Sequence, residues 1–174
     1  GAEKIVGINP LGVAIPASAE LPIVHDAAFS GSSHGKIRIH QQKGPPIPES
    51  WALDKDGNPT TDAAAAVEGL LRPIGEFKGV SLALIMGILS SMLSGAAYGL
   101  ELGNMVDGPR AGQDGHFVAA IKISAFEDVD HFKHRVDAAI RQLHEVRKAP
   151  GFARTYAPGE VEQLREREYR QDGI

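Results

Sequence analysis

A long amphipathic segment between Asp128 and Lys148 is the feature that most constrains the fold. Its apolar residues recur every three or four positions and fall on a single stripe, which comprises Val129, Phe132, Val136, Ile140, Leu143 and Val146. This period predicts a helix whose apolar face is buried against another layer of the protein. Pro150 follows the stripe and ends the helix.

Short apolar runs elsewhere predict strands. Leu11–Ile15 and Leu21–Val24 resemble short buried strands that lie close together in one sheet, and His116–Ile123 suits a central strand. Lys36–Lys43 fits a strand or a short helix equally well. Strands that alternate with long helices indicate a layered α/β fold.

Three further helices are expected. Thr61 and Asp62 cap a helix that extends through Leu71, and Gly79–Leu93 is apolar enough to be a helix buried on most sides. A charged helix follows Pro158. The long stretch Gly95–Gly115 is rich in glycine and predicts a loop.

Composition excludes several function classes. The formal net charge is −4 with no long run of one sign, so we expect no nucleic-acid partner and no membrane partner. The chain has no cysteine, and the longest apolar stretch is too short and too mixed to span a bilayer. No secretion signal opens the sequence, so a cytoplasmic location is expected. His131 and His134 have a spacing that can chelate a metal, but their charged neighbours favour a solvated helix surface, and no metal site is predicted.

The glycine fingerprint of ordinary dinucleotide-binding folds, G-x-G-x-x-G between a strand and a helix, is absent. Six stretches instead resemble, in the same order, the type-2 malate/L-lactate dehydrogenase family, which includes ureidoglycolate, sulfolactate and diketogulonate dehydrogenases. These stretches are Gly7–Pro16, Pro22–Ser30, Gly35–Ile37 resuming at Ile47–Asp62, Pro73–Gly79, Gly115–Phe117 and Pro158–Glu160.

The resemblance implies an α/β fold with a mixed, non-Rossmann sheet between helical layers. Residues 1–174 would form a single partial domain, the cofactor-binding portion of a longer dehydrogenase. The family interconverts 2-hydroxy acids and 2-keto acids with NAD or NADP, so a nicotinamide cofactor and a small acid substrate are expected. A homodimer, or a complementary chain, is the expected partner.

The first expected contact is Asp26, at the end of an apolar strand. A carboxylate there can accept both hydroxyls of an adenosine ribose, or it can cap a turn. The resemblance favours the cofactor and extends the contact over His25, Asp26, Ala27, Ala28, Phe29 and Ser30. Asp26 would repel a 2′-phosphate, so NAD is preferred over NADP.

Two further groups complete the predicted site. Lys78 can meet a phosphate and Phe77 can pack on a ring, or Lys78 is simply an exposed residue at a helix start. Pro158, Gly159 and Glu160 precede a helix, where backbone N–H groups and a carboxylate suit a polar ligand, although Glu160 also suits the helix dipole. The resemblance implies cofactor contacts at all five residues.

No catalytic residue is predicted. In the family, a histidine and an arginine do the acid–base and carboxylate-binding work, and they lie ahead of anything that matches Gly7. We therefore expect the isolated chain to bind cofactor weakly and to be inactive. The alternative is a non-catalytic assembly module that associates through the apolar segment Val80–Leu93.

Overall fold

A computed structural model of the chain describes residues 3–103 and 108–173. The chain divides into two compact units. Unit 1 comprises Gly1–Pro10 and Ala28–Val118, and unit 2 comprises Leu11–Ala27 and Ala119–Ile174. The prediction of a single partial domain stays a prediction.

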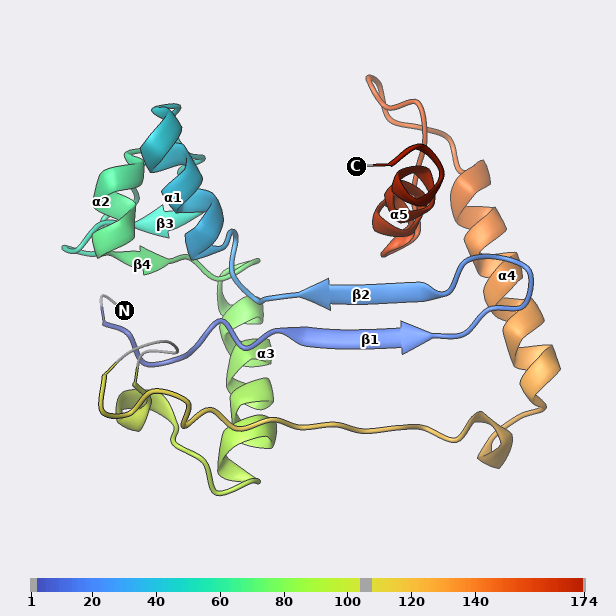
Figure 1. Cartoon of the computed structure of the whole chain (residues 1–174), viewed down its shortest axis with the longest axis horizontal. Coiled ribbons are helices and arrows are strands. Elements are labelled where there is room, and N and C mark those ends of the chain that lie inside the picture. The colour runs from blue at the N-terminus through green and yellow to red at the C-terminus, as the bar shows by residue number, and fades with distance from the viewer. Residues whose placement is uncertain (1–2, 104–107, 174) are drawn as a thin grey trace. The chain divides into compact units, whose positions relative to one another are not determined.

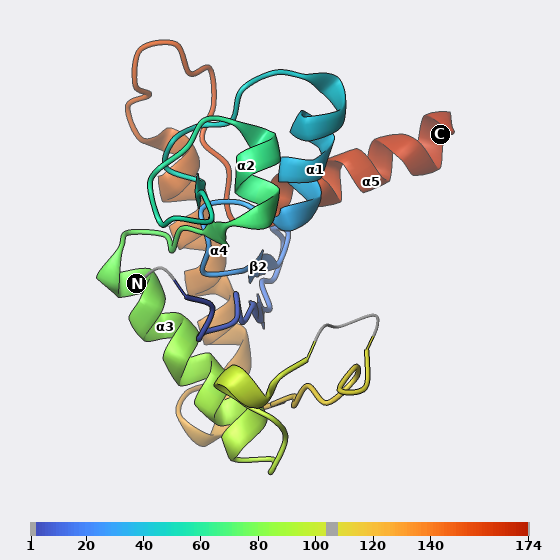
Figure 2. The same ribbon diagram turned by 90° about the vertical axis from the view of Figure 1, so that its left-hand side faces the viewer.

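Unit 1 is mainly helical, with one small sheet (Figure 1). In chain order, its elements are α1 (His34–Lys43), β3 (Ala52–Leu53), α2 (Ala63–Glu68), β4 (Leu70–Leu71) and α3 (Phe77–Gly87). Helix α3 continues as a π-helical segment (Ile88–Met92), and a 3-10 turn (Gly99–Glu101) follows. The helices α1 and α2 lie side by side in both views (Figures 1 and 2).

The segment that fitted a strand or a helix equally well is helix α1. Ser33 caps it, with its hydroxyl accepting a hydrogen bond from the Lys36 N–H at 3.2 Å. Gly44 ends it in the left-handed conformation, with φ of 88°. These two capping residues favour the helix over the strand, because the alternating pattern of apolar residues between them is compatible with either.

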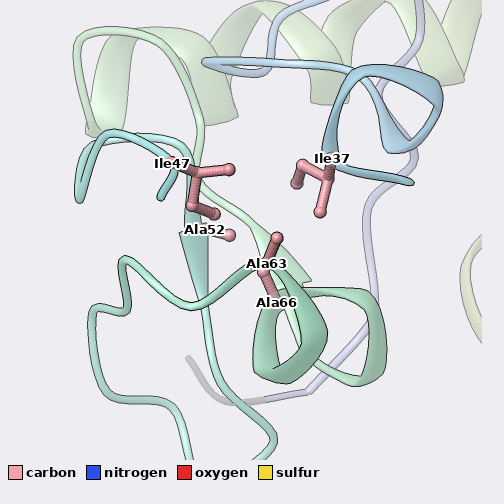
Figure 3. Packing of buried hydrophobic residues seen from close by; sticks show 5 residues of the cluster. All are labelled: Ile37, Ile47, Ala52, Ala63 and Ala66. Carbon is pink, nitrogen blue, oxygen red and sulfur yellow. The ribbon is translucent and has the colours of Figure 1, made fainter. Parts of the chain in front are cut away.

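The core of unit 1 is an apolar cluster of Ile37, Ile47, Ala52, Ala63 and Ala66 (Figure 3). Ile37 from α1 is fully buried, and the two alanines of α2 let the helices approach closely. Trp51, Val67 and Leu71 pack around the cluster. The proline-rich loop contributes Ile47, whose N–H donates to the Thr61 carbonyl at 3.0 Å.

Helix α2 is shorter than predicted. The Asp62 cap is confirmed, since its carboxylate accepts from the Ala64 N–H at 2.8 Å. The helix ends at Glu68, however, and Leu70–Leu71 forms strand β4, antiparallel to β3. Gly69 makes this change possible, because a β-carbon there would lie 2.0 Å from the Leu53 carbonyl oxygen.

Helix α3 is not buried on most sides, so that prediction is wrong. Its buried residues are the small ones, Gly79, Ala83 and Gly87, which recur every four positions. Its large residues face outward, including Val80, Leu82, Leu84 and Ile85, and Ile88 and Leu93 after it are exposed as well. The small stripe permits close backbone packing, and the sequence period does not reveal which face a largely apolar helix buries. None of the described helices is long and apolar enough to cross a membrane.

Unit 2 contains a hairpin and two long helices: β1 (Leu11–Ile15), β2 (Ile23–Ala27), a 3-10 turn (Ile123–Ala125), α4 (Val129–Glu145) and α5 (Glu160–Asp172). The two strands pair antiparallel with Val13 opposite His25, so two early strands are present as predicted, although the second covers Ile23–Ala27 rather than Leu21–Val24. The prediction that they are buried is wrong, since Val13 is 40% exposed and neither strand has a buried residue. Helix α4 confirms the dominant amphipathic segment. Asp128 caps it by accepting from the His131 N–H at 2.8 Å.

The predicted central strand His116–Ile123 is wrong. The chain there is extended but pairs with no strand in the described ranges (Figure 1). Val118 is 92% exposed and Ile121 is 79% exposed. An apolar run acquires strand structure only when a partner supplies hydrogen bonds, which residue type alone does not provide.

The part of the chain that the structure describes is thus mixed α/β with two small antiparallel sheets. A larger non-Rossmann sheet between helical layers stays a prediction. The predicted loop Gly95–Gly115 contains the 3-10 turn, and its residues 104–107 lie outside the described ranges.

Candidate cofactor site

The predicted contacts fall into two groups, one in each unit. Unit 2 holds His25, Asp26 and Ala27 together with Pro158–Glu160. Unit 1 holds Ala28–Ser30 together with Phe77 and Lys78. Within each unit, segments that are distant in the sequence meet.

In unit 2, the segment before α5 lies against strand β2. The Val24 N–H donates to the Pro158 carbonyl at 3.0 Å. Gly159 has a φ of 79°, and a β-carbon on it would lie 2.6 Å from the Val24 carbonyl oxygen. Only glycine fits such a position, for both conformational and steric reasons. Pro158 and Gly159 are therefore held beside the strand end that carries His25 and Asp26.

The Asp26 side chain has open space beside it. Asp26 is exposed and pairs with Gly12 across the hairpin. Directly opposite residues on an antiparallel pair share a face, and Gly12 has nothing within 4 Å of the place where a side chain would begin. A ligand edge can therefore reach the carboxylate from the Gly12 side.

Glu160 differs from Asp26 because it is buried, with 5% of its surface exposed. Its carboxylate accepts hydrogen bonds from the Ala157 N–H at 2.9 Å, from His144 Nε2 at 2.7 Å and from the Arg154 guanidinium. Burial raises the pKa of Glu160, but these donors and charges outweigh it and hold the pKa below its usual value. Glu160, His144 and Arg154 line a cavity of about 270 Å³.

In unit 1, the turn before α3 folds over Phe29 and Ser30. The Ile74 N–H donates to the Phe29 carbonyl at 3.0 Å, and Ser30 bridges to Pro73. A β-carbon on Gly79 would lie 2.3 Å from the Ile74 carbonyl oxygen. The two predicted segments of unit 1 are thus joined through close backbone contacts.

The side chains of this second group divide by exposure. Phe29 is 6% exposed and belongs to the packed interior, so only its backbone can face a ligand. Phe77 is 73% exposed and Lys78 is also exposed, both in the first turn of α3. An ammonium group at a helix start favours an anion.

The side chains of each group, taken separately, are of types that suit parts of a nicotinamide dinucleotide. An accessible carboxylate suits ribose hydroxyls, a lysine at a helix start suits a phosphate, and an exposed aromatic ring suits a base or nicotinamide face. A second cavity of about 330 Å³ is lined by His40, Asp62 and neighbouring residues, and none of the predicted contacts lines it.

Sequence reasoning missed Asp137. This residue of α4 is 1% exposed, and its carboxylate accepts three backbone hydrogen bonds, from the N–H groups of Ser18, Ala19 and Glu20 at 2.9, 3.0 and 3.2 Å. It thereby ties the β1–β2 connection to α4. The local sequence does not indicate this role, because an acidic residue beside an apolar stripe is typical of a solvent-facing position on a helix. His131 and His134, by contrast, lie on the exposed face of α4.

Comparison with known proteins adds the decisive observation. A match to the malate/L-lactate dehydrogenase family extends over residues 1–174. The chain belongs to this family. It is 33% identical to the ureidoglycolate dehydrogenase (NAD(+)) of Escherichia coli K12 and 34% identical to the L-sulfolactate dehydrogenase of Methanothermobacter thermautotrophicus, in both cases over 100% of its own length.

Solved structures agree with the family membership. The malate dehydrogenase of Entamoeba histolytica matches 98% of the chain with a TM-score of 0.90 at 32% identity. The sulfolactate dehydrogenase of Methanocaldococcus jannaschii matches 100% of it with a TM-score of 0.81. The chain spans about half the length of its relatives, namely 50% and 49% of the two curated enzymes and 51% and 49% of the two solved chains.

Proposed function

We propose that this chain supplies the cofactor platform of an NAD(P)-dependent oxidoreductase that interconverts a 2-hydroxy acid and its 2-keto acid. Family membership supports the oxidoreductase class. Relatives are named as malate, sulfolactate and ureidoglycolate dehydrogenases, with NAD(+) in one name and NADP(+) in another. When bound, the nicotinamide would carry the hydride that is exchanged with the acid.

The observation that carries the proposal is the meeting of two distant segments in unit 2. The exposed Asp26 lies on a strand whose Val24 is bonded to Pro158, and Gly12 leaves space beside its carboxylate. In this proposal Asp26 accepts the ribose hydroxyls, with His25, Ala27 and the backbone of Gly159 beside it. The negative charge at this position favours NAD over NADP.

Unit 1, taken by itself, offers a separate group of contacts of the kind that a nicotinamide cofactor needs. Lys78 and the first turn of α3 would hold a phosphate, and Phe77 would cover an aromatic ring. The backbone of Ala28–Ser30 would line the approach. The general acid and the group that binds the substrate carboxylate would lie outside residues 1–174. The non-Rossmann sheet, the homodimer and the complementary chain stay predictions.

NADH titration of the pure chain, followed by NADH fluorescence, tests the proposal. We expect saturable binding, no reduction of 2-keto acids, and a Kd raised about tenfold or more by Asp26→Ala, because a charge-assisted hydrogen bond is lost. Asp172→Ala is the matched control, since it removes an exposed acid of the same unit. Preference for NADH over NADPH should also shrink in the Asp26 variant.

Three results would contradict parts of this proposal. Absence of saturable binding overturns the cofactor platform, and concentration-dependent association in its place would support an assembly module. Measurable keto-acid reduction by the pure chain overturns the statement that catalytic residues lie elsewhere. An Asp26→Ala Kd equal to that of the control removes Asp26 from the site.

A further inference from the structure

The carboxylate of Glu160 is engaged entirely with its own chain. Oε2 accepts from the Ala157 N–H and from His144 Nε2, and Oε1 accepts from Arg154. The carboxylate is ionised, so the His144 nitrogen that faces it is the donor. The side chain is 6% exposed and therefore presents little of itself to a ligand.

The residues next to Glu160 are held on the opposite side by the hairpin. Pro158 bonds to Val24 of β2. Gln163 of α5 donates to the carbonyls of both Pro22 and Gly159, each at 3.0 Å. The short segment Pro158–Glu160 is thus fixed between α4 on one side and β2 on the other, and Glu160 provides the bond to His144 of α4.

We propose that His144 and Arg154 are positioning residues for the cofactor, acting through Glu160 to hold the backbone of Pro158 and Gly159 beside Asp26. This inference rests on the proposed function. It changes the role of Glu160 from a ligand contact to an internal anchor, and it adds two residues that the sequence did not indicate.

The segment before α5 depends on this anchor because its backbone follows an irregular path. Residues 146–159 contain no helix or strand, so few backbone hydrogen bonds order them. Thr155 adds one anchor, with its hydroxyl donating to the Leu143 carbonyl at 2.5 Å. Without the His144 bond, the buried carboxylate loses the one partner that ties it to α4, and the segment gains freedom. Cofactor binding must then order that segment again, which lowers affinity.

Other charges around this anchor do not replace His144. Lys148, which lies just beyond the end of α4, donates to the His144 carbonyl, and Glu20 pairs with Arg141 at 3.0 Å. Arg167 of α5 lines the same cavity. Arg154 is 48% exposed and lies over the Tyr156 ring, so its bond to Glu160 is the more readily exchanged with water.

NADH affinity and amide exchange of the full chain test the inference. His144→Ala should raise the Kd for NADH about tenfold, because the anchor loses a bond to a charged group. His144→Gln keeps an N–H donor and should restore the Kd to within about twofold. His131→Ala is the matched control, since this histidine lies on the same helix but is 64% exposed. Arg154→Gln, at a half-exposed position that tolerates change, should raise the Kd about threefold.

Exchange of the Ala157 amide separates positioning from general stability. This N–H donates to Glu160, so it should exchange faster in His144→Ala while the amides in the middle of α4 keep their protection. Wild-type NADH binding with an unchanged Kd in His144→Ala and Arg154→Gln would overturn the inference and leave the proposed function intact. A wild-type chain that binds no NADH would overturn both. Failure of His144→Gln to restore affinity would also count against positioning.

Discussion

Units 1 and 2 keep their interiors together by different means. Unit 1 has an apolar cluster in which Ile37 and Ile47 pack against alanines of α2 and β3. In the described part of unit 2, the buried residues are Ile140, Ala157 and two carboxylates, Asp137 and Glu160. One unit relies on removing apolar surface from water, and the other relies strongly on ionised acids that meet hydrogen-bond donors.

This difference indicates which kind of change should destabilise each unit most. Apolar packing depends on volume and shape, so unit 1 should respond to truncation of a buried side chain. A buried carboxylate depends on its charge and its donors, so unit 2 should respond to protonation as well. The two units therefore call for different probes.

The largest expected effect is in the apolar cluster. Ile37→Ala leaves a cavity at a fully buried site and should lower the free energy of unfolding by about 3 kcal/mol. Ile37→Val, which removes a single methylene, should cost about 1 kcal/mol. Fluorescence of Trp51, which packs on this cluster, reports the transition under urea. Equal costs for the two variants would show that the cluster is loosely packed.

Asp137 is the corresponding test in unit 2. Asp137→Asn keeps the side-chain shape but replaces one acceptor oxygen by an NH₂ group that faces backbone donors. We expect the melting temperature to fall by roughly 5 °C. Amide exchange of Ser18, Ala19 and Glu20 should quicken, while the cluster of unit 1 is unaffected. Asp172→Asn serves as the exposed control, and faster exchange in unit 1 as well would contradict separate modes of stabilisation.

Acid should act on unit 2 through the same two carboxylates. The hydrogen bond from Ala19 lowers the pKa of Asp137, and burial opposes it less strongly than the three N–H donors together. The pKa of Glu160 is lowered too. Folded-state values below the unfolded ones stabilise the protein above the unfolded pKa, and this stability is lost as the pH falls through the folded values.

Amide exchange compared between pH 6 and pH 3.5, corrected for intrinsic rates, measures this loss. The β1–β2 connection and the segment before α5 should lose protection most. In unit 1, burial and the nearby charges of Lys4 and Arg38 lower the pKa of His34, which gives a smaller loss in the same direction as the pH falls below the ordinary histidine value. Equal losses of protection in the two units would contradict the idea that buried carboxylates stabilise unit 2 more than unit 1.

The smallest effect is expected at the surface pair of Arg170 and Glu166. These side chains are 76% and 60% exposed, one turn apart on α5. Arg170→Ala should change the free energy of unfolding by less than about 0.5 kcal/mol, because water screens the pair. Urea unfolding of this variant gives the free-energy change of an exposed substitution, with which the changes in the buried variants can be compared. A larger loss would mean that α5 depends on surface charge rather than on its buried residue Glu160.

Local sequence was sufficient where a single element carries its own signals. The helix α4, the Asp62 cap and the existence of two early strands are as predicted, because helix period, capping residues and short β-branched runs act over a few positions. The family was also identified from ordered motifs. The predicted contacts could be named in this way, although their roles stay predictions.

Only the tertiary structure decided the rest, because it depends on which segments meet. The sequence did not show that α3 buries its small residues, that His116–Ile123 lacks a strand partner, or that Leu70 and Leu71 leave the helix for β4. It gave no sign that the Asp137 carboxylate would accept hydrogen bonds from a turn more than a hundred positions away, or that His144 would donate one to Glu160. A carboxylate has the same local signature on a surface as in an interior, and its role is set by the donors that folding brings to it.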